Sequence, residues 1–254
     1  MVAVPSRSSA SRGRGFFLAF AITCALIAFL SFLPTYWLPM IGGSLRLAPT
    51  VHLHAALQFG WVSLFVVQAA LAGSGRLALH RALGVTGVLL AAAVLAAGIV
   101  AALHSYHLQA AAGHADQARA FLIAPLTNVL LFAGLVVVAA GNFRRPDIHK
   151  RLMVIATVAV LVPAVARVFL VLVTGGTTVV PPPIHVTLVP SLITDLLLVA
   201  AMWRDRRIHG RVHRAYWIGG GLLVAVQVLR VPLALTPAWQ SMADGLIRLG
   251  APIH

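Results

Sequence analysis

Long apolar segments, separated by short basic loops, constrain this chain more than any other feature of its sequence. Several of these segments reach the roughly 20 residues that a helix needs to cross the hydrocarbon core of a bilayer. Hydrophobic residues make up 60% of the 254 positions and charged residues only 9%, whereas a soluble domain has about 25% charged residues. Because a lipid-exposed backbone must satisfy its own hydrogen bonds, the sequence predicts an all-α integral membrane helical bundle.

About seven transmembrane helices are expected within residues 16–235. They follow a basic amino-terminal segment, residues 1–15, that we expect to be disordered, and they precede a short, weakly amphipathic extracytoplasmic tail, residues 236–254. The first span is expected to be retained, because YWLPM follows it where a signal peptide would have a small-residue cleavage site. The predicted spans are 16–32, two within the hairpin 51–109, 120–141, 151–174, 184–203 and 215–235.

The basic residues predict the orientation of the bundle. Of the 19 lysines and arginines, 14 fall on one side of the predicted membrane. The positive-inside rule places this side in the cytoplasm, with the amino-terminus inside and the carboxy-terminus outside a bacterial plasma membrane. The net charge of +14 is therefore attributed to topology and lipid headgroups rather than to nucleic acid. The 14 are Arg7, Arg12, Arg14, Arg76, Arg81, Arg144, Arg145, Lys150, Arg151, Arg204, Arg206, Arg207, Arg211 and Arg214.

Three cytoplasmic turns resemble one another and indicate an internal repeat. LALHRALG, DIHKRLMV and RVHRAYWI each place a histidine and then a basic residue where an outward-running helix begins, at His80, His149 and His213. We infer three related helical hairpins plus one further helix. The three histidines are expected to anchor these hairpins at headgroup level, with ligation or proton transfer as the alternative.

A second group of histidines lies at the opposite, outer end of the chain's predicted hairpin 51–109. His54 shares a helix face with Gln58 and Trp61, and His104 and His107 lie near the end of the returning helix. Neutral imidazoles on facing helices can hold a haem iron or a copper ion, so these three histidines are the predicted metal ligands. Ordinary interfacial histidines are the alternative interpretation.

Charged residues inside the predicted spans form the third feature. Asp195 lies near the membrane midplane, and Arg167 and Arg230 lie in the outer half. A charge in hydrocarbon costs at least about 2.5–3.5 kcal/mol, so these side chains are expected to face the bundle interior. One aspartate neutralises one arginine, and the remaining positive charge could hold a haem propionate or a substrate carboxylate. The alternative is a structural Asp–Arg pair, with the other arginine extending toward the outer headgroups. In this alternative, interhelical hydrogen bonds are made by Asn128, Gln58, Gln68 and Gln227.

The arrangement of His54, the His80-Arg81 pair and His104 or His107 resembles the small His-rich bacterial membrane proteins associated with cytochrome oxidase assembly. It is also similar to uncharacterised multi-pass membrane families with an HR or HKRLM turn. The resemblance covers about a quarter of the chain. It implies a role linked to haem or copper near respiratory complexes.

Three functions follow from these features. The first is haem b or copper binding for electron transfer or oxidase assembly, held by His54, His104, His107, Arg167 and Arg230. The second is proton-coupled transport of a small anion, using Arg167 and Arg230 with Asp195 as the proton-coupled carboxylate. The third is a non-catalytic subunit of a larger membrane complex. No Ser/His/Asp spacing, HExxH motif or phosphate-binding glycine loop occurs, so no catalytic residue is assigned.

Overall fold

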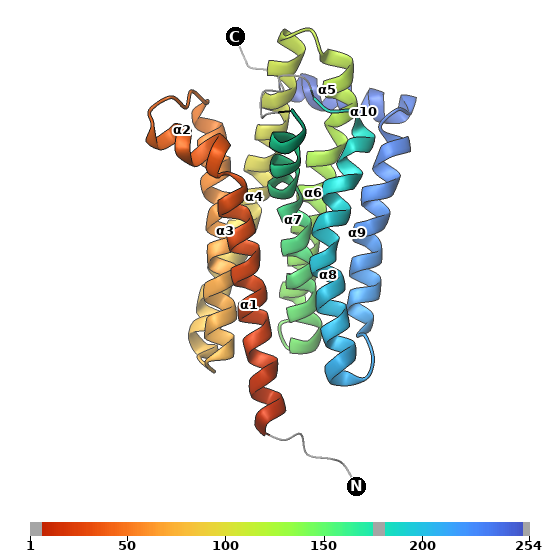
Figure 1. Cartoon of the computed structure of the whole chain (residues 1–254). Helices are drawn as coiled ribbons and strands as arrows, with labels where there is room; N and C mark the ends of the chain where they lie inside the picture. Colours follow the sequence, from red (N-terminus) through yellow and green to blue (C-terminus); the bar gives the residue numbers. More distant parts are fainter. Residues whose placement is uncertain (1–6, 175–180, 251–254) are drawn as a thin grey trace.

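Every element in the described part of the chain is helical, which confirms the predicted all-α bundle (Figure 1). The structure is a computed structural model that describes residues 7–174 and 181–250, with side chains for residues 15–172 and 181–250. Its elements are α1 (Arg7–Ser31), η1 (Leu33–Trp37), α2 (Leu38–Ile41), α3 (Pro49–Gly73), α4 (Leu77–Ala111), α5 (Ala115–Phe121), α6 (Ile123–Gly141), α7 (Pro146–Thr174), η2 (Ile184–Thr187), α8 (Leu188–His209), α9 (Arg214–Leu233) and α10 (Pro237–Leu249).

Six segments of the described chain are long and apolar enough to cross a membrane, and a bent segment at the amino-terminus brings the number to seven. This segment bends by 43° between Ser31 and Leu33. The break coincides with η1, a π-helix that contains Pro34, whose ring nitrogen has no proton to donate. Residues 7–15 of the segment that was expected to be disordered belong to α1. Residues 1–6 lie outside the described part.

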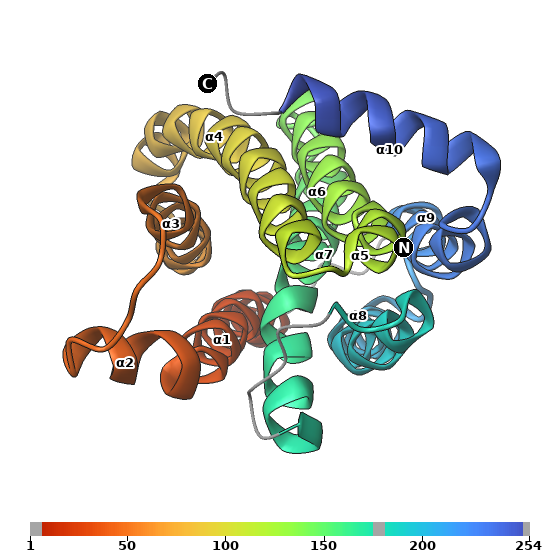
Figure 2. The same cartoon turned by 90° about the horizontal axis from the view of Figure 1, so that it is seen from above.

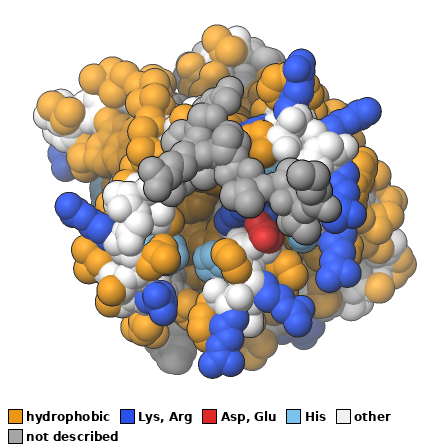
Figure 3. Space-filling model, turned by 90° about the horizontal axis from the view of Figure 1, so that it is seen from below, with side chains coloured by type: hydrophobic (Ala, Val, Ile, Leu, Met, Phe, Trp, Pro, Cys, Tyr) orange, Lys and Arg blue, Asp and Glu red, His pale blue; other side chains and the backbone are white. Residues whose placement is uncertain are grey.

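The long helices stand side by side, and their connections alternate between two ends of the bundle (Figure 1). We call the end that carries the α3–α4, α6–α7 and α8–α9 turns the basic end, and the end that carries α5 and α10 the α10 end. Figure 3 shows lysine and arginine side chains surrounding the basic end. Viewed along the bundle, α7 lies centrally, with α3 and α4 on one side and α8 and α9 on the other (Figure 2).

The histidines of the repeated turns bind helix ends. His80 Nδ1 lies 3.3 Å from the carbonyl oxygen of Gln68 near the end of α3, and His149 Nδ1 lies 2.8 Å from that of Ala139 near the end of α6. Each therefore ties the start of one helix to the end of the helix before it. His213 differs, because its Nδ1 accepts a hydrogen bond from the Ala215 N–H at 3.1 Å and so caps the start of α9. These contacts fit hairpin anchoring.

The cap at His213 predicts a loss of stability in mild acid. Burial, together with the nearby charge of Arg151, lowers the pKa of His213 below its usual 6.5, although Asp205 acts in the opposite direction. The unfolded chain therefore binds a proton at a higher pH than the folded chain does, and only neutral Nδ1 can accept the bond from Ala215. The stabilisation is complete above about pH 6.5 and disappears as the pH falls below that value. Thermal unfolding between pH 8 and 5 measures the effect; a His213→Asn variant, which retains a capping side chain without titrating, should lose this pH-dependent component.

The predicted tail contains the amphipathic helix α10, which lies across the α10 end of the bundle (Figure 2). The Thr236 hydroxyl caps its start by accepting from the Trp239 N–H at 3.2 Å. Trp239 is buried and donates from Nε1 to the Arg119 carbonyl oxygen at 3.1 Å, and Arg119 pairs with Asp244 at 3.0 Å. The tail is thus packed against the α5 region rather than extended from it.

Candidate intramembrane polar site

The buried face of α8 is more polar than its exposed face. Thr187, Ser191 and Asp195 follow one another at steps of four residues, which places them on one side of the helix, and all three are buried. Leu192 and Leu196 are 60% and 64% exposed on the outside of the bundle. Because polar side chains are costly in contact with hydrocarbon, α8 turns its polar residues toward α6 and α9.

Arg230 of α9 is the largest polar side chain in this interior, and only 1% of its surface is exposed. Its Nη1 donates to Asn128 Oδ1 of α6 at 3.0 Å. Its Nη2 donates to the Ser191 hydroxyl at 2.9 Å and to the Thr187 carbonyl oxygen at 3.3 Å. The side-chain Nε is buried and has no hydrogen-bond partner among the described residues. The guanidinium thus joins α6, η2, α8 and α9 through neutral acceptors.

Asp195 lies in the same interior and is 7% exposed. Its Oδ1 accepts a hydrogen bond from Gln227 Nε2 of α9 at 3.2 Å, whereas its Oδ2 is buried without a partner in the described part of the chain. No carboxylate of the described residues lies within ion-pair distance of Arg230. The structural Asp195–Arg230 ion pair that the sequence left open is therefore not formed in this conformation.

Both charged groups lie far from the basic end. At a rise of about 1.5 Å per residue, Arg230 is roughly 24 Å from the start of α9, and Asp195 is roughly 21 Å from the end of α8. Because the two helices are antiparallel and share a short turn, the side chains reach nearly the same level. The site thus places one buried cation and one buried carboxylate at a similar depth inside the bundle.

Arg167, the other predicted intramembrane arginine, lies elsewhere. Its guanidinium carbon is 5.3 Å from the centre of the Phe32 ring at the end of α1. Arg167 is an exposed residue of α7, whereas Arg230 is buried. The two arginines thus contact different helices, and Arg167 has the exposure expected of a side chain that extends toward headgroups.

The outer histidines are divided between different contacts. His52 Nδ1 lies 2.9 Å from the Tyr36 hydroxyl, whereas His54 Nδ1 and His107 Nε2 are buried with no partner among the described residues. His104 is half-buried. Within residues 7–174 and 181–250, no three or more His, Cys, Asp or Glu side chains are grouped so as to hold a metal ion. The prediction of one metal site built from His54, His104 and His107 therefore finds no support in the described structure.

A second buried charged cluster, at the basic end, was missed in the sequence. Arg151 of α7 binds both carboxylate oxygens of Asp205 of α8, and each side chain is 3% exposed. Asp205 Oδ2 also accepts from the backbone N–H of His213 at 2.8 Å. From sequence, Arg151 is only one of the 14 basic residues that predict the orientation, although Asp205 is the one acidic residue in a turn with five arginines. That isolated charge was the available signal.

The polar site also includes Gln227, which was expected only as an interhelical hydrogen-bonding group, and two residues that the sequence did not single out, Thr187 and Ser191. Their spacing could have identified them, because polar residues four apart within an apolar helix indicate a shared interior face. Together with Asn128, Asp195 and Arg230 they form a hydrogen-bonded site within the apolar bundle.

Comparison of the chain with protein-family models, with curated proteins and with solved structures finds no match to any of them.

Proposed function

We propose that this multi-pass membrane protein transports a small anion, which binds at Arg230, and couples its movement to a proton carried by Asp195. The observation that supports the proposal is the burial of the Arg230 guanidinium without a carboxylate partner among the described residues. A cation in a membrane interior is costly even where a carboxylate lies nearby, and such residues usually mark a substrate or ion pathway. The positive-inside rule orients the basic end toward the cytoplasm.

The guanidinium has N–H groups that no described residue accepts and that could bind an anion. It carries five N–H bonds, of which three are used by Asn128, Ser191 and Thr187. The Nε–H has no described partner. A planar pair of donors suits a carboxylate or another small oxyanion. Since the surrounding side chains are themselves buried, the anion has to be small.

Asp195 supplies the coupling by charge balance. While Asp195 is ionised, its negative charge compensates Arg230 across the site. When an anion binds, a proton on the partnerless Oδ2 of Asp195 restores a neutral balance, so one proton would accompany each anion. Gln227 can hydrogen-bond to Oδ1 in both states.

Replacing Arg230 with glutamine should abolish proton-driven anion uptake, because glutamine retains hydrogen bonding and removes the charge. The test is uptake of formate, acetate, lactate and nitrate into liposomes that contain the purified protein under an imposed pH gradient. Arg248→Gln is the matched control, because Arg248 is exposed on α10 and donates to the Asp244 carbonyl oxygen of its own helix. Equal uptake by folded Arg230→Gln protein and wild type would contradict the proposal.

Haem binding is the second candidate, and the buried, unpartnered nitrogens of His54 and His107 favour it. A bis-histidine haem needs only two protein ligands, one from each helix of the α3–α4 hairpin. This function would place the protein in electron transfer or oxidase assembly. The absorption spectrum of the same purified protein distinguishes the candidates, since a Soret band that sharpens on reduction supports haem, and a colourless protein that takes up anions supports transport.

A further inference from the structure

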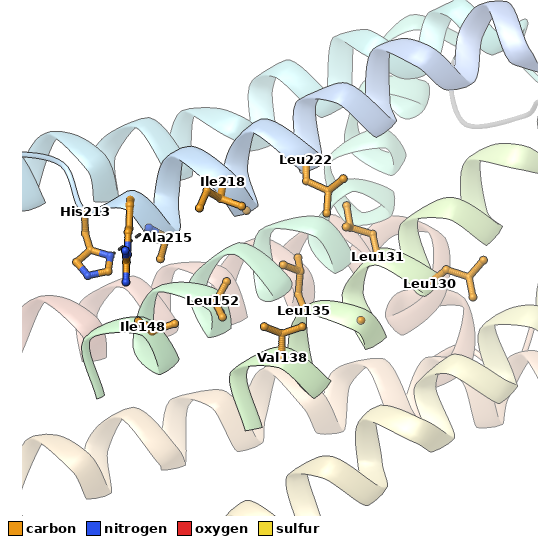
Figure 4. Close-up of a pocket in the computed structure, with 13 residues that line it drawn as sticks. Leu130, Leu131, Leu135, Val138, Ile148, Leu152, His213, Ala215, Ile218 and Leu222 are labelled. Atoms are coloured by element: carbon orange, nitrogen blue, oxygen red, sulfur yellow. Dashed lines mark hydrogen bonds between the residues drawn. The ribbon is translucent and has the colours of Figure 1, made fainter. Parts of the chain in front are cut away.

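An apolar groove runs along the outside of the bundle between α6 and α9, with α7 as its floor (Figure 4). Its volume is about 460 Å³. Leu135 and Val138 of α6 and Leu152 of α7 line one side, and Ile218 and Leu222 of α9 line the other. Ile218 is 71% exposed and Val138 52% exposed, so the groove opens toward the surroundings of the bundle.

Glycines create the depth of this groove. Gly134 of α6 lines it, and a Cβ added there would meet no atom within 4 Å, so the space in front of it is open. Gly219 of α9 lies closer to the floor, where an added Cβ would come within 2.8 Å of Ile155 Cδ1. The first glycine therefore leaves room for an external group, whereas the second allows α9 to pack closely on α7.

One end of the groove is cationic. His213 and Arg214 line it at the basic end of the bundle, and Arg214 is exposed. From Arg214 to Leu222 the groove follows α9 for roughly 12 Å at about 1.5 Å per residue. Half of a hydrocarbon core is about 15 Å thick. The groove thus has a charged mouth at headgroup level and an apolar length close to that of one leaflet.

We infer that this groove binds one acyl chain of an anionic phospholipid, with the lipid phosphate paired to Arg214. Arg214 favours a headgroup that adds no positive charge beside the phosphate, such as glycerol rather than choline, and the apolar walls favour an acyl chain. Charge complementarity and length therefore both favour a lipid.

The inference is tested by native mass spectrometry of the delipidated full-length protein after addition of phosphatidylglycerol or phosphatidylcholine with identical acyl chains. Gly134→Leu should fill the groove and weaken phosphatidylglycerol binding by about tenfold, the equivalent of losing about 1.4 kcal/mol of binding free energy. Gly221→Leu is its matched control, because Gly221 is an equally open glycine of α9 that does not line the groove.

Arg214→Gln should remove the preference for phosphatidylglycerol. Arg76→Gln should retain it, because Arg76 is an exposed cation in the α3–α4 turn, away from the groove.

Two results would overturn the inference. Equal affinity of wild type for the two lipids would remove the role of Arg214, and equal binding by the Gly134 and Gly221 variants would remove the role of the groove. Co-purification of a neutral quinone that the Gly134 variant loses would assign the groove to a different ligand. Disulfide cross-linking of two copies through Ile218→Cys at native density would assign it to a dimer interface.

Discussion

Replacing Asp205 with asparagine is expected to destabilise the folded protein by about 3–5 kcal/mol, the usual cost of leaving one member of a buried ion pair alone. The side chains of Asp205 and Arg151 are each 3% exposed, and the guanidinium binds both carboxylate oxygens. Asparagine cannot neutralise the guanidinium. The bonds that the carboxylate makes to α7 and to the α8–α9 turn would weaken together. Thermal unfolding of the purified protein in one detergent measures the change.

Asp147→Asn provides the control for this experiment. Asp147 also contacts Arg151, at 3.3 Å, but its side chain is 65% exposed. Because exposed ion pairs are screened by water, its loss should cost less than about 1 kcal/mol. Equal unfolding temperatures for the two variants would show that burial of the pair is not what stabilises this end of the bundle. The double variant Arg151→Met with Asp205→Leu should recover most of the lost stability, because no charge then remains unpaired.

The helical class of this protein could be predicted from sequence because it depends on segment length and polarity alone. The apolar segments exceed the span of a bilayer, and no other backbone structure except a closed barrel satisfies its hydrogen bonds there. The end of the first span was harder to place. Pro34 and the π-helix around it divide that segment, and hydropathy does not detect a change of helix geometry.

Side-chain partners could not be predicted to the same extent, because they depend on how each helix is rotated and tilted. Arg167 and Arg230 have similar depths in sequence, yet one lies against Phe32 and the other between α6 and α8. The histidines show the same limitation, since His52 meets Tyr36 of the segment before α3. Depth follows from counting residues along a helix, whereas contacts require the packing of several helices at once.

Replacing Asp195 with asparagine is expected to abolish proton-coupled uptake while lowering the free energy of unfolding by less than Asp205→Asn does. Asparagine retains an oxygen that can accept from Gln227 Nε2, and the atom that it replaces has no described partner. Neither carboxylate oxygen is within ion-pair distance of Arg230, so no direct ion pair is broken. Asparagine cannot carry a proton, and transport that requires one should stop.

The same substitution at two levels of the buried face of α8 therefore has opposite expected consequences. At Asp205 the carboxylate is bound by an arginine and a backbone N–H, and its loss should appear in unfolding measurements. At Asp195 one oxygen is unpartnered, and its loss should appear in liposome uptake driven by a pH gradient. If Asp195→Asn lowers stability as much as Asp205→Asn does, Asp195 is a structural group. Unchanged uptake by a stable Asp195→Asn protein would instead exclude it as the proton carrier, because a side chain without a titrating group would then support the same transport.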